Sequence, residues 1–273
     1  MLDDLQKSVL QSLDGNRDAG IYPYLAYLLQ DLWELGTPVN GIIDLIKKHN
    51  LHRQGNISVL DLGCGKGAVS VNLAREFGCR CHGIDGLPEF IDESIRRANE
   101  YGVQPLCRFE TGDIRKIKPG KELYDLIILG SVGWVFGNPR DTLSGLVKFL
   151  KSGGYMLIAD SYLPDKSIFK HPQYFRRREI AAAIEQNRLE IRDEHFDDPS
   201  AMVDENDRMY ELIEARVREL SDSYPQKKDL FEGTLRTDLQ KKDLFEGYLR
   251  AQQDEIDVLE NEVTGVTWLL KKS

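Results

Sequence analysis

Residues 59–70 read VLDLGCGKGAVS. An apolar run ends at Asp61, and Gly63, Gly65 and Gly67 then alternate with other residues. Glycine between a strand and a helix permits a tight turn and lets a ligand approach the backbone. The free N–H groups at the start of the following helix attract an anionic group. The stretch therefore predicts a strand, a ligand-binding turn and a helix.

The glycines alone do not choose the ligand, because GCGKGA also fits the dinucleotide pattern G-x-G-x-x-G/A. The carboxylates discriminate better. Asp61 precedes Gly63 by two residues, where it would repel a pyrophosphate and favour an ammonium or sulfonium cation. Asp85 ends the next expected strand, the position at which an acid accepts hydrogen bonds from ribose hydroxyls. Asp113 ends the third expected strand, a position at which an acid could accept a hydrogen bond from an adenine amino group.

The composition favours a globular protein without a polyanionic partner. The chain has 273 residues, of which 41% are hydrophobic, and a formal net charge of −9. Such an average field disfavours DNA or bulk RNA as a substrate. The first ten residues lack the basic start and apolar core of a secretory signal, and no run reaches the roughly 18 apolar residues of a membrane helix. We expect a cytoplasmic protein whose four cysteines stay reduced and bind no metal.

Short apolar runs alternate with amphipathic stretches from residue 57 onward, a pattern typical of βαβ crossovers. Strands are expected at 57–63, 79–85, 105–113, 124–131, 155–163 and 189–196, and helices at 68–78, 87–102, 141–154 and 176–187. Residues 24–36 and 39–50 predict two earlier helices, and residues 203–261 are strongly helical and charged. The last run, 263–272, is expected as an antiparallel strand at the sheet edge.

The charged helical stretch contains an internal repeat. QKKDLFEGTLR at 226–236 returns as QKKDLFEGYLR at 240–250, and only Thr234 and Tyr248 differ. The offset of 14 residues is almost four helical turns, so a second copy rotates the apolar stripe by only about 40°. We interpret the repeat as a tolerated duplication that lengthens the helix; a longer arm over the active site or a dimer contact is the functional alternative.

Residues 57–163 resemble the class I (Rossmann-like) S-adenosylmethionine-dependent methyltransferases of small molecules. The likeness lies in five segments in the same order: VLDLGCGKG, GIDGLPEFI, TGDI, YDLIILGS and LKSGGYMLIADSYL. It implies a doubly wound α/β fold with a seven-stranded, mostly parallel sheet, and S-adenosyl-L-methionine as cofactor. It also implies an antiparallel last strand between strands five and six, rather than at the edge, with N-terminal helices and a helical insertion between strands six and seven.

The domain limits that follow are a helical lid at 1–50, a cofactor-binding core at 51–199, a helical cap at 200–261 and a final core strand at 262–273. The resemblance also assigns the cofactor site. The glycine turn would contact the methionine portion, Asp61 would hold the amino group through the turn, and Asp85 would bind the ribose. The full set of expected cofactor-binding residues is Asp61, Gly63, Cys64, Gly65, Gly67, Asp85, Gly86, Asp113, Ile114, Leu129, Gly130 and Ser131.

The methyl acceptor is less well defined. An enclosed pocket under the lid and cap favours a small molecule, and a neutral nucleophile would need a nearby base. Aromatic and histidine side chains near the expected strand ends and in the N-terminal helices are the candidates for acceptor contacts: Tyr22, Tyr24, Trp134, Tyr162 and His171. The sequence assigns no catalytic base. The Arg176-Arg177-Arg178 run is either a solvated helix start or a grip for an anionic acceptor.

Two other classes remain open. A nicotinamide-dependent oxidoreductase would share the glycine pattern, but Asp61 argues against its pyrophosphate. A non-catalytic binding protein, self-associated as a homo-oligomer through the long helices, would share the scaffold. Within the methyltransferases, Asn138-Pro139-Arg140 lies too far after strand four for a DNA adenine enzyme. The cysteines, Cys79, Cys81 and Cys107 among them, are poorly spaced for arsenite methylation.

Overall fold

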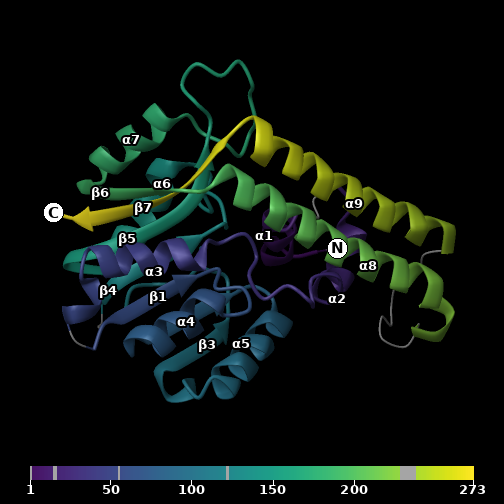
Figure 1. The fold of residues 1–273 in the computed structure, drawn as a ribbon, viewed down its shortest axis with the longest axis horizontal. Helices are drawn as coiled ribbons and strands as arrows, with labels where there is room; N and C mark the ends of the chain where they lie inside the picture. Colours follow the sequence, from purple (N-terminus) through teal and green to yellow (C-terminus); the bar gives the residue numbers. More distant parts are fainter. Residues whose placement is uncertain (1, 15–16, 55, 121–122, 228–237) are drawn as a thin grey trace. The chain divides into compact units, whose positions relative to one another are not determined.

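The computed structural model describes residues 2–14, 17–54, 56–120, 123–227 and 238–273. The chain divides into two compact units (Figure 1). The helical unit comprises Met1–Trp33 and Asp198–Asn261, and the sheet unit comprises Glu34–Asp197 and Glu262–Ser273. The boundary near the N-terminus falls at residue 33, because the helix that follows, α3 (Val39–Lys48), packs in the sheet unit. The lid and cap roles expected for 1–50 and 200–261 stay predictions.

The sheet unit is built on seven strands in the order β3-β2-β1-β4-β5-β7-β6. The strands are β1 (Ser58–Leu62), β2 (Arg80–Asp85), β3 (Cys107–Thr111), β4 (Tyr124–Gly130), β5 (Leu150–Tyr162), β6 (Leu189–Phe196) and β7 (Thr264–Lys272). β1 to β5 are parallel, and β7 runs antiparallel to both β5 and β6. The expected doubly wound fold is confirmed. β7 lies between β5 and β6, so the simple reading of 263–272 as an edge strand is wrong.

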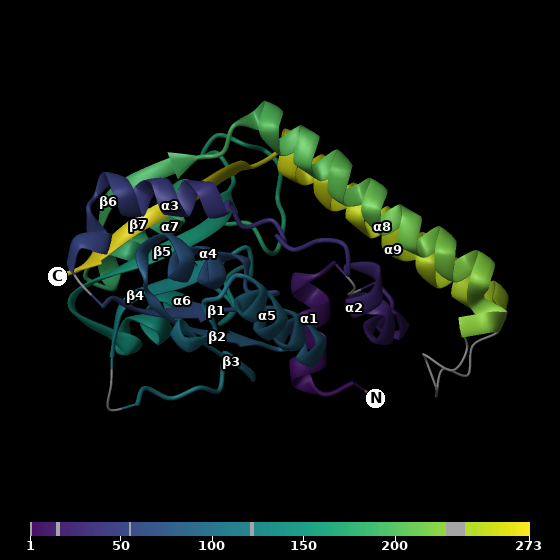
Figure 2. The ribbon, with the colours of Figure 1, turned by 60° about the horizontal axis from the view of Figure 1, so that its bottom comes forward.

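Helices cover the sheet in two groups. One group contains α3 (Val39–Lys48), α4 (Ala68–Phe77) and α5 (Pro88–Glu100), and the other contains α6 (Pro139–Leu146) and α7 (Arg177–Gln186) (Figures 1 and 2). One hydrophobic core lies between the sheet and the second group and includes Ile127, Met156 and Leu143, all fully buried. Strands buried by helices on both faces explain the continuous apolar runs of the sequence.

Asp193 on β6 fastens α3 to the sheet. Its Oδ2 lies 2.7 Å from Lys48 Nζ and 2.6 Å from His49 Nε2, at the end of the helix. These partners hold the pKa of Asp193 at about 2, well below its usual range. Close packing assists the contact, because Gly41 on α3 lies against the His195 ring, which a Cβ there would approach to 2.7 Å.

One helix in the structure is shorter than the sequence predicts. Residues 141–154 were expected to form a helix closed by a glycine pair, but α6 ends at Leu146, a 3-10 turn covers Val147–Phe149, and β5 begins at Leu150. Gly153 and Gly154 therefore lie inside a strand. Gly153 has φ +71°, next to an irregularity in the β4–β5 register. The pair is the signature of a β-bulge rather than of a helix end.

The helical unit consists of α1 (Asp4–Ser12), a 3-10 helix at Ala19–Tyr24 (η1), α2 (Leu25–Leu28), α8 (Pro199–Lys227) and α9 (Asp238–Asn261). α8 and α9 lie side by side and run antiparallel, and Asn206 donates to Glu260 across the pair at 3.0 Å (Figures 1 and 2). Asp31 pairs with Arg216 of α8 through two hydrogen bonds. Tyr24 packs edge-on against Phe245 of α9, with ring centroids 5.0 Å apart. The N-terminal segment and the insertion thus share one core.

The helix expected at 24–36 is also wrong over most of its length. Only Leu25–Leu28 is α-helical, and residues 29–38 are irregular. Leu28, Leu29 and Leu32 are nevertheless all buried. The apolar spacing that suggested a long helix reflects burial of these side chains, which tertiary packing satisfies with a turn instead.

The second copy of the repeat lies within α9, where Leu244, Phe245 and Tyr248 are buried in the helical unit. The first copy begins at the end of α8, and its residues 228–236 lie outside the described part of the chain. Whether the duplication lengthens one helix is therefore not tested.

The turn between β1 and α4 yields a first prediction. Gly67 has φ +74°, and a Cβ there would lie 2.9 Å from Ser94 Cβ; Gly78, at the other end of α4, has φ +67° with nothing within 4 Å. Both Gly67→Ala and Gly78→Ala incur left-handed backbone strain of about 1 kcal/mol. We expect Gly67→Ala to lower the free energy of unfolding by about 1–2 kcal/mol more than Gly78→Ala does, because overpacking adds to the strain at Gly67. Equal losses in urea denaturation would contradict this account.

Candidate cofactor site

The glycine turn is held to the end of the second strand by backbone hydrogen bonds. The N–H groups of Gly63 and Cys64 both donate to the Ile84 carbonyl, at 2.8 and 3.1 Å. Gly63, Gly65 and Gly67 all have positive φ, so the turn has a conformation that other residues rarely adopt. Gly63 also lies against Val132, whose Cγ2 would be 2.4 Å from a Cβ. The expected turn is present, and it sits where strand order reverses between β1 and β4, the usual ligand position in such sheets.

Asp85 stands at the end of β2 and accepts two backbone hydrogen bonds. Its Oδ2 accepts from Gly65 N at 2.9 Å, and its Oδ1 accepts from Leu87 N, also at 2.9 Å. Burial raises the pKa of Asp85, and the N–H donors, Gly86 among them, partly offset that rise. Each carboxylate oxygen has two lone pairs, so both retain the capacity to accept from a ribose hydroxyl.

Asp61 is more deeply buried, with 3% of its surface exposed. Its Oδ2 accepts from the Ser70 hydroxyl of α4 at 2.7 Å, which ties the strand to the helix. Burial raises the pKa of Asp61 to about 6, and the negative charge of Asp85 contributes to the rise. The side chain is therefore not an exposed contact, and its expected action on a ligand through the turn stays a prediction.

Two further side chains of the turn are buried. Burial raises the pKa of the Cys64 thiol well above its usual range, and the charges of Asp61 and Asp85 add to that effect. The thiol is thus a packing group. Lys66 is 4% exposed, and its ammonium lies 5.2 Å from the centre of the Phe90 ring. A buried cation on an aromatic face belongs to the local structure of this turn, which the sequence pattern gave no reason to expect.

Asp113 follows β3, as expected, but its carboxylate already has a partner. Arg115 donates to it from Nε and Nη2, at 2.8 and 2.9 Å, and from its backbone N at 3.0 Å. These bonds, with Lys116, hold the pKa of Asp113 at about 2. Ile114 packs against the core beside it. The expected contact of Asp113 with adenine stays a prediction, and Arg115 is a neighbour that the sequence reading missed.

The end of β4 supplies the third expected part of the site. Leu129 is buried in the core, and Ser131, with φ +53°, donates its N–H to Ala159 at 2.8 Å. A segment from the N-terminal side of α3 lies against these ends. A Cβ on Gly130 would lie 2.6 Å from Thr37 Cγ2, and one on Gly65 would lie 3.3 Å from Leu35 Cδ1. Leu35–Thr37 thus joins the site, although its sequence indicated only the end of a helix.

Two of the expected acceptor residues belong to the core. Trp134 and Tyr162 are 8% and 7% exposed and pack around Trp268 of β7, with ring centroids 6.5 and 6.1 Å from it. Trp268 donates to Glu194 at 3.0 Å. The indole N–H of Trp134 is buried and has no hydrogen-bond partner among the described residues. Trp134 thus keeps a buried donor that no described residue uses.

The other acceptor candidates lie in separate places. His171 sits on the loop between β5 and α7, stacked with Phe169 and next to Tyr174, and accepts from Gln173 N at 3.3 Å. Tyr22 and Tyr24 are in η1 of the helical unit, where Tyr24 is fully buried. Trp134, Tyr162 and His171 thus belong to the sheet unit, and Tyr22 and Tyr24 belong to the helical unit. The roles of all five stay predictions.

The arginine run has a mostly structural role. Arg176 donates to the carbonyls of Pro164, Asp165 and Ser167, which secures the loop before α7. Arg177 pairs with Glu194, at 2.7 Å to the nearer oxygen. Neither guanidinium is simply solvated, and both are already engaged by the protein.

The cysteines and acidic groups offer no metal centre in the described ranges. All four cysteines are free, and Cys81 pairs in register with Cys107 near the amino ends of β2 and β3, opposite the glycine turn. Within the same ranges, every helix is too short or too polar to cross a membrane.

Comparison with known proteins agrees with this geometry. The family model described as "Methyltransferase domain" matches residues 53–235. A curated relative, "Ubiquinone biosynthesis O-methyltransferase" of Rickettsia bellii (strain OSU 85-389), is 29% identical over 121 residues, which is 44% of this chain and 48% of the relative. The chain spans about half the length of the curated relatives it matches first.

Solved structures share the fold. A S-adenosylmethionine-dependent methyltransferase from Geobacter sulfurreducens, in complex with S-adenosyl-L-homocysteine, has a TM-score of 0.72 at 17% identity over 90% of this chain and 96% of its own. The [4+2]-cyclase SpnF has a TM-score of 0.65 at 14% identity, over 97% of this chain and 94% of its own. The fold alone therefore does not fix the reaction. The family model covers well over half of the chain, and the protein belongs to the methyltransferase domain family.

Proposed function

We propose that the protein transfers a methyl group from S-adenosyl-L-methionine to a small-molecule acceptor. Family membership supports the reaction class, and one observation supports the cofactor most directly. Asp85, at the end of β2, fixes the glycine turn through Gly65 and keeps acceptor capacity for ribose hydroxyls. No finding favours a nicotinamide dinucleotide over this cofactor.

The electrostatics of the turn fit a sulfonium cofactor. Asp61 and Asp85 are two carboxylates whose pKa values are raised by burial, and Asp85 contributes to the rise at Asp61. A ligand with positive charge on sulfur and on its amino group would relieve this repulsion, whereas a pyrophosphate would increase it. The twelve residues expected to bind the cofactor are retained as the proposed site, with Leu35–Thr37 added.

The cofactor supplies an activated methyl group, so the protein chiefly provides alignment and excludes water. Asp85 would orient the nucleoside, the glycine turn would let the methionine portion approach the backbone, and Leu129–Ser131 would line the side on which the acceptor approaches. Leu35–Thr37 would limit access of water to that side. No described residue is assigned as a general base.

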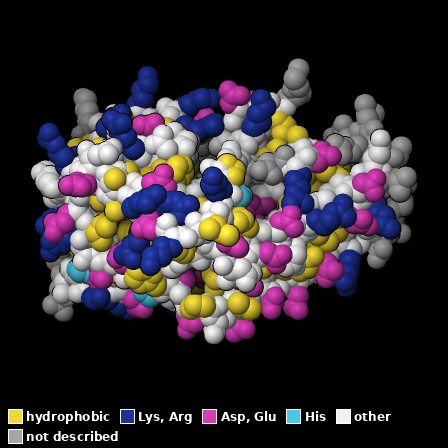
Figure 3. All heavy atoms as spheres, turned by 90° about the horizontal axis from the view of Figure 1, so that it is seen from above, with side chains coloured by type: hydrophobic (Ala, Val, Ile, Leu, Met, Phe, Trp, Pro, Cys, Tyr) yellow, Lys and Arg dark blue, Asp and Glu magenta, His cyan; other side chains and the backbone are white. Residues whose placement is uncertain are grey.

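The acceptor is proposed to be a small organic molecule. Curated relatives include enzymes described as O-, N- and C-methyltransferases, so the likeness does not fix the atom that is methylated. The net charge of −9 disfavours a polyanion, and on the face drawn in Figure 3 lysine and arginine side chains are interspersed with acidic and hydrophobic ones. A cytoplasmic location and a homo-oligomeric state stay predictions.

Methyl transfer is tested directly with cofactor carrying a tritiated methyl group. We expect incubation with fractionated small-molecule extract to give labelled product in at least one fraction, and incubation with bulk RNA or DNA to give none. Boiled protein is the control. Label that appears only in nucleic acid would contradict the proposed acceptor class, and a chain that binds NAD but not S-adenosylhomocysteine would contradict the proposed cofactor.

The role of Asp85 gives a sharper test. Asp85→Ala removes the acceptor of two backbone N–H groups and of the ribose hydroxyls, and charge-assisted hydrogen bonds are strong. We expect affinity for S-adenosylhomocysteine to fall at least tenfold in calorimetric titration. Glu89→Ala removes an exposed carboxylate from the first turn of α5 and serves as the matched control, with less than twofold change. Equal effects of the two substitutions would show that only net charge matters.

The raised pKa of Asp61 predicts a pH dependence. Asp61 is charged above its pKa of about 6 and becomes neutral as the pH falls through that value. Its attraction for a cationic ligand is therefore present at pH 7 and lost at pH 5. We expect affinity for S-adenosylmethionine to fall several-fold over this interval, and Asp61→Asn, which keeps an oxygen for Ser70, to flatten the profile. An unchanged wild-type affinity between pH 7 and pH 5 would rule out the electrostatic role.

A further inference from the structure

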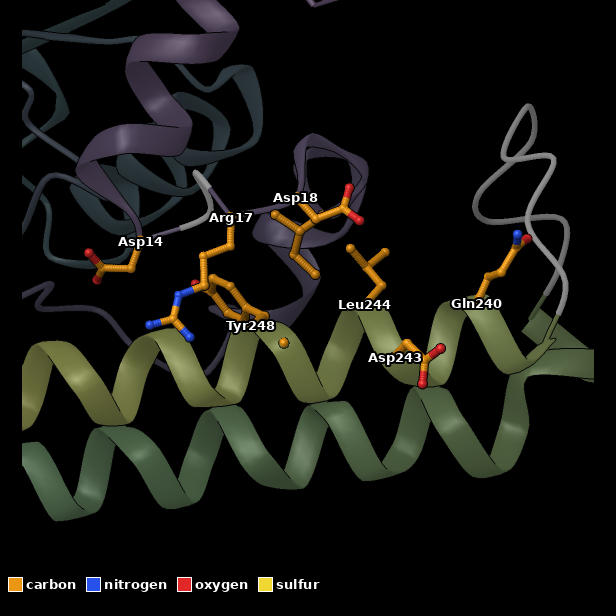
Figure 4. A pocket seen from close by; sticks show the side chains of 9 residues that line it. Asp14, Arg17, Asp18, Gln240, Asp243, Leu244 and Tyr248 are labelled. Carbon is orange, nitrogen blue, oxygen red and sulfur yellow. The ribbon is translucent and has the colours of Figure 1, made fainter.

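The helical unit contains a cavity that has no part in the proposed cofactor site. It lies between α9 and the residues Asp14, Arg17, Asp18 and Ile21, and it has a volume of about 450 Å³ (Figure 4). That volume is within the range of small-molecule sites. None of its lining residues belongs to the proposed cofactor site, which includes Leu35–Thr37.

The middle of the cavity is apolar. Ile21, Leu244 and Tyr248 contribute buried side chains there. Gly247 leaves open space between them, because a Cβ on this residue would meet nothing within 4 Å. The α9 residues that line the cavity run from Gln240 to Tyr248, a span of about 12 Å along the helix axis. The space is therefore elongated along α9.

Acidic side chains lie at both ends of this apolar middle. Asp14 and Arg17 are beside Tyr248 at one end, and Asp243 is toward the other (Figure 4). Asp18 is a third lining carboxylate. Arg17 is the one cation among the lining residues that the structure describes, and it already forms an ion pair with Asp254 outside the lining. The charged side chains that the structure describes in the lining are therefore mostly acidic.

The carboxylate at the Asp14 end is poorly compensated. Asp14 accepts one long hydrogen bond, from Gln252 at 3.3 Å. The hydroxyl of Tyr248 donates to the Leu13 carbonyl at 3.2 Å and not to Asp14. Burial raises the pKa of Asp14 to about 7, and the charge of Glu255 adds to the rise. At the other end, Asp243 is exposed and has no hydrogen bond or ion pair with any described residue.

The repeat noted in the sequence forms one wall of this cavity. Five of the nine lining residues, from Gln240 to Tyr248, come from the second copy. The only position at which the copies differ is Tyr248 in place of Thr234, and it lies in this wall. The duplicated sequence thus departs from its first copy only where it faces the cavity.

From the cavity, its apolar middle and its acidic ends, we propose that it binds an elongated organic dication of the aliphatic diamine or polyamine class. An ammonium group lies at each end, and the methylene chain packs over Gly247 and Leu244. The proposal does not depend on methyl transfer or on the identity of the acceptor.

The test uses the full chain and 1,8-diaminooctane as probe in calorimetric titration at moderate salt. Octylamine has one ammonium group fewer, and 1,8-octanediol has none at the same length. We expect the diamine to bind, octylamine to bind at least fivefold more weakly, and the diol at least tenfold more weakly. No binding by the diamine at millimolar concentration, or equal binding of the diol, would overturn the proposal.

Three substitutions locate the binding. Gly247→Leu fills the cavity, and because leucine is a better helix former than glycine it preserves α9; we expect at least tenfold weaker binding of the diamine. Asp243→Asn removes one acidic end and is expected to cost threefold or more. Glu246→Gln makes the same charge change three residues further along α9, at a residue that is not among those lining the cavity, and should cost less than twofold. Wild-type affinity in Gly247→Leu, or equal effects of Asp243→Asn and Glu246→Gln, would overturn the site.

Discussion

A single carboxylate organises the head of the sheet. Asp85 accepts hydrogen bonds from Gly65 in the turn after β1 and from Leu87 at the start of α5, so it ties together the first two crossovers of the fold. Glycine has little intrinsic preference between positive and negative φ, and these hydrogen bonds select the positive-φ conformation that the glycines of the turn adopt. The cost is a carboxylate removed from water, which is visible as a raised pKa. A cationic ligand would offset that cost, and this links the stability of the turn to cofactor binding.

The site is assembled from segments far apart in the sequence, and their close approach depends on small residues. Because these glycines have no side chain, the side chain of Val132 lies against Gly63 and that of Thr37 lies against Gly130. The side chain of Leu35 lies near Gly65 in the same way. A methyl group at the first two positions would overlap its neighbour, whereas Leu35 would have to give only slightly. The glycines near the ends of β1 and β4 therefore serve packing between loops, in addition to the ligand approach that we propose for them. This dual use explains why one short motif carries so much of the information about both fold and function.

Regular alternation made the sheet predictable. Strands β1 to β4 and helices α4, α5 and α7 follow from periodicity and from glycine at the turns. The failures have physical causes. Leu28, Leu29 and Leu32 keep helical spacing but are buried through a turn, and Gly153 marks a bulge that resembles a helix end in sequence. The placement of Leu35–Thr37 beside the turn depends on tertiary contacts that no local pattern encodes. The pairing of Asp113 with Arg115 is local, between residues two apart, but the spacing alone does not tell whether the guanidinium binds this carboxylate or another group.

The helical unit shows why a lid and a cap should not be considered separately. Tyr24 packs on Phe245, Asp31 pairs with Arg216, and Tyr248 donates to Leu13, so segments from both ends of the chain share one core. Any ligand that stabilises α9 would also stabilise the N-terminal segment, since both belong to one cooperative structure. We expect the duplication to be tolerated in this setting, because an offset of fourteen residues nearly preserves a helix face. Within the second copy, the one altered residue, Tyr248, donates a hydrogen bond from α9 to the Leu13 carbonyl, which joins the helix to the N-terminal segment.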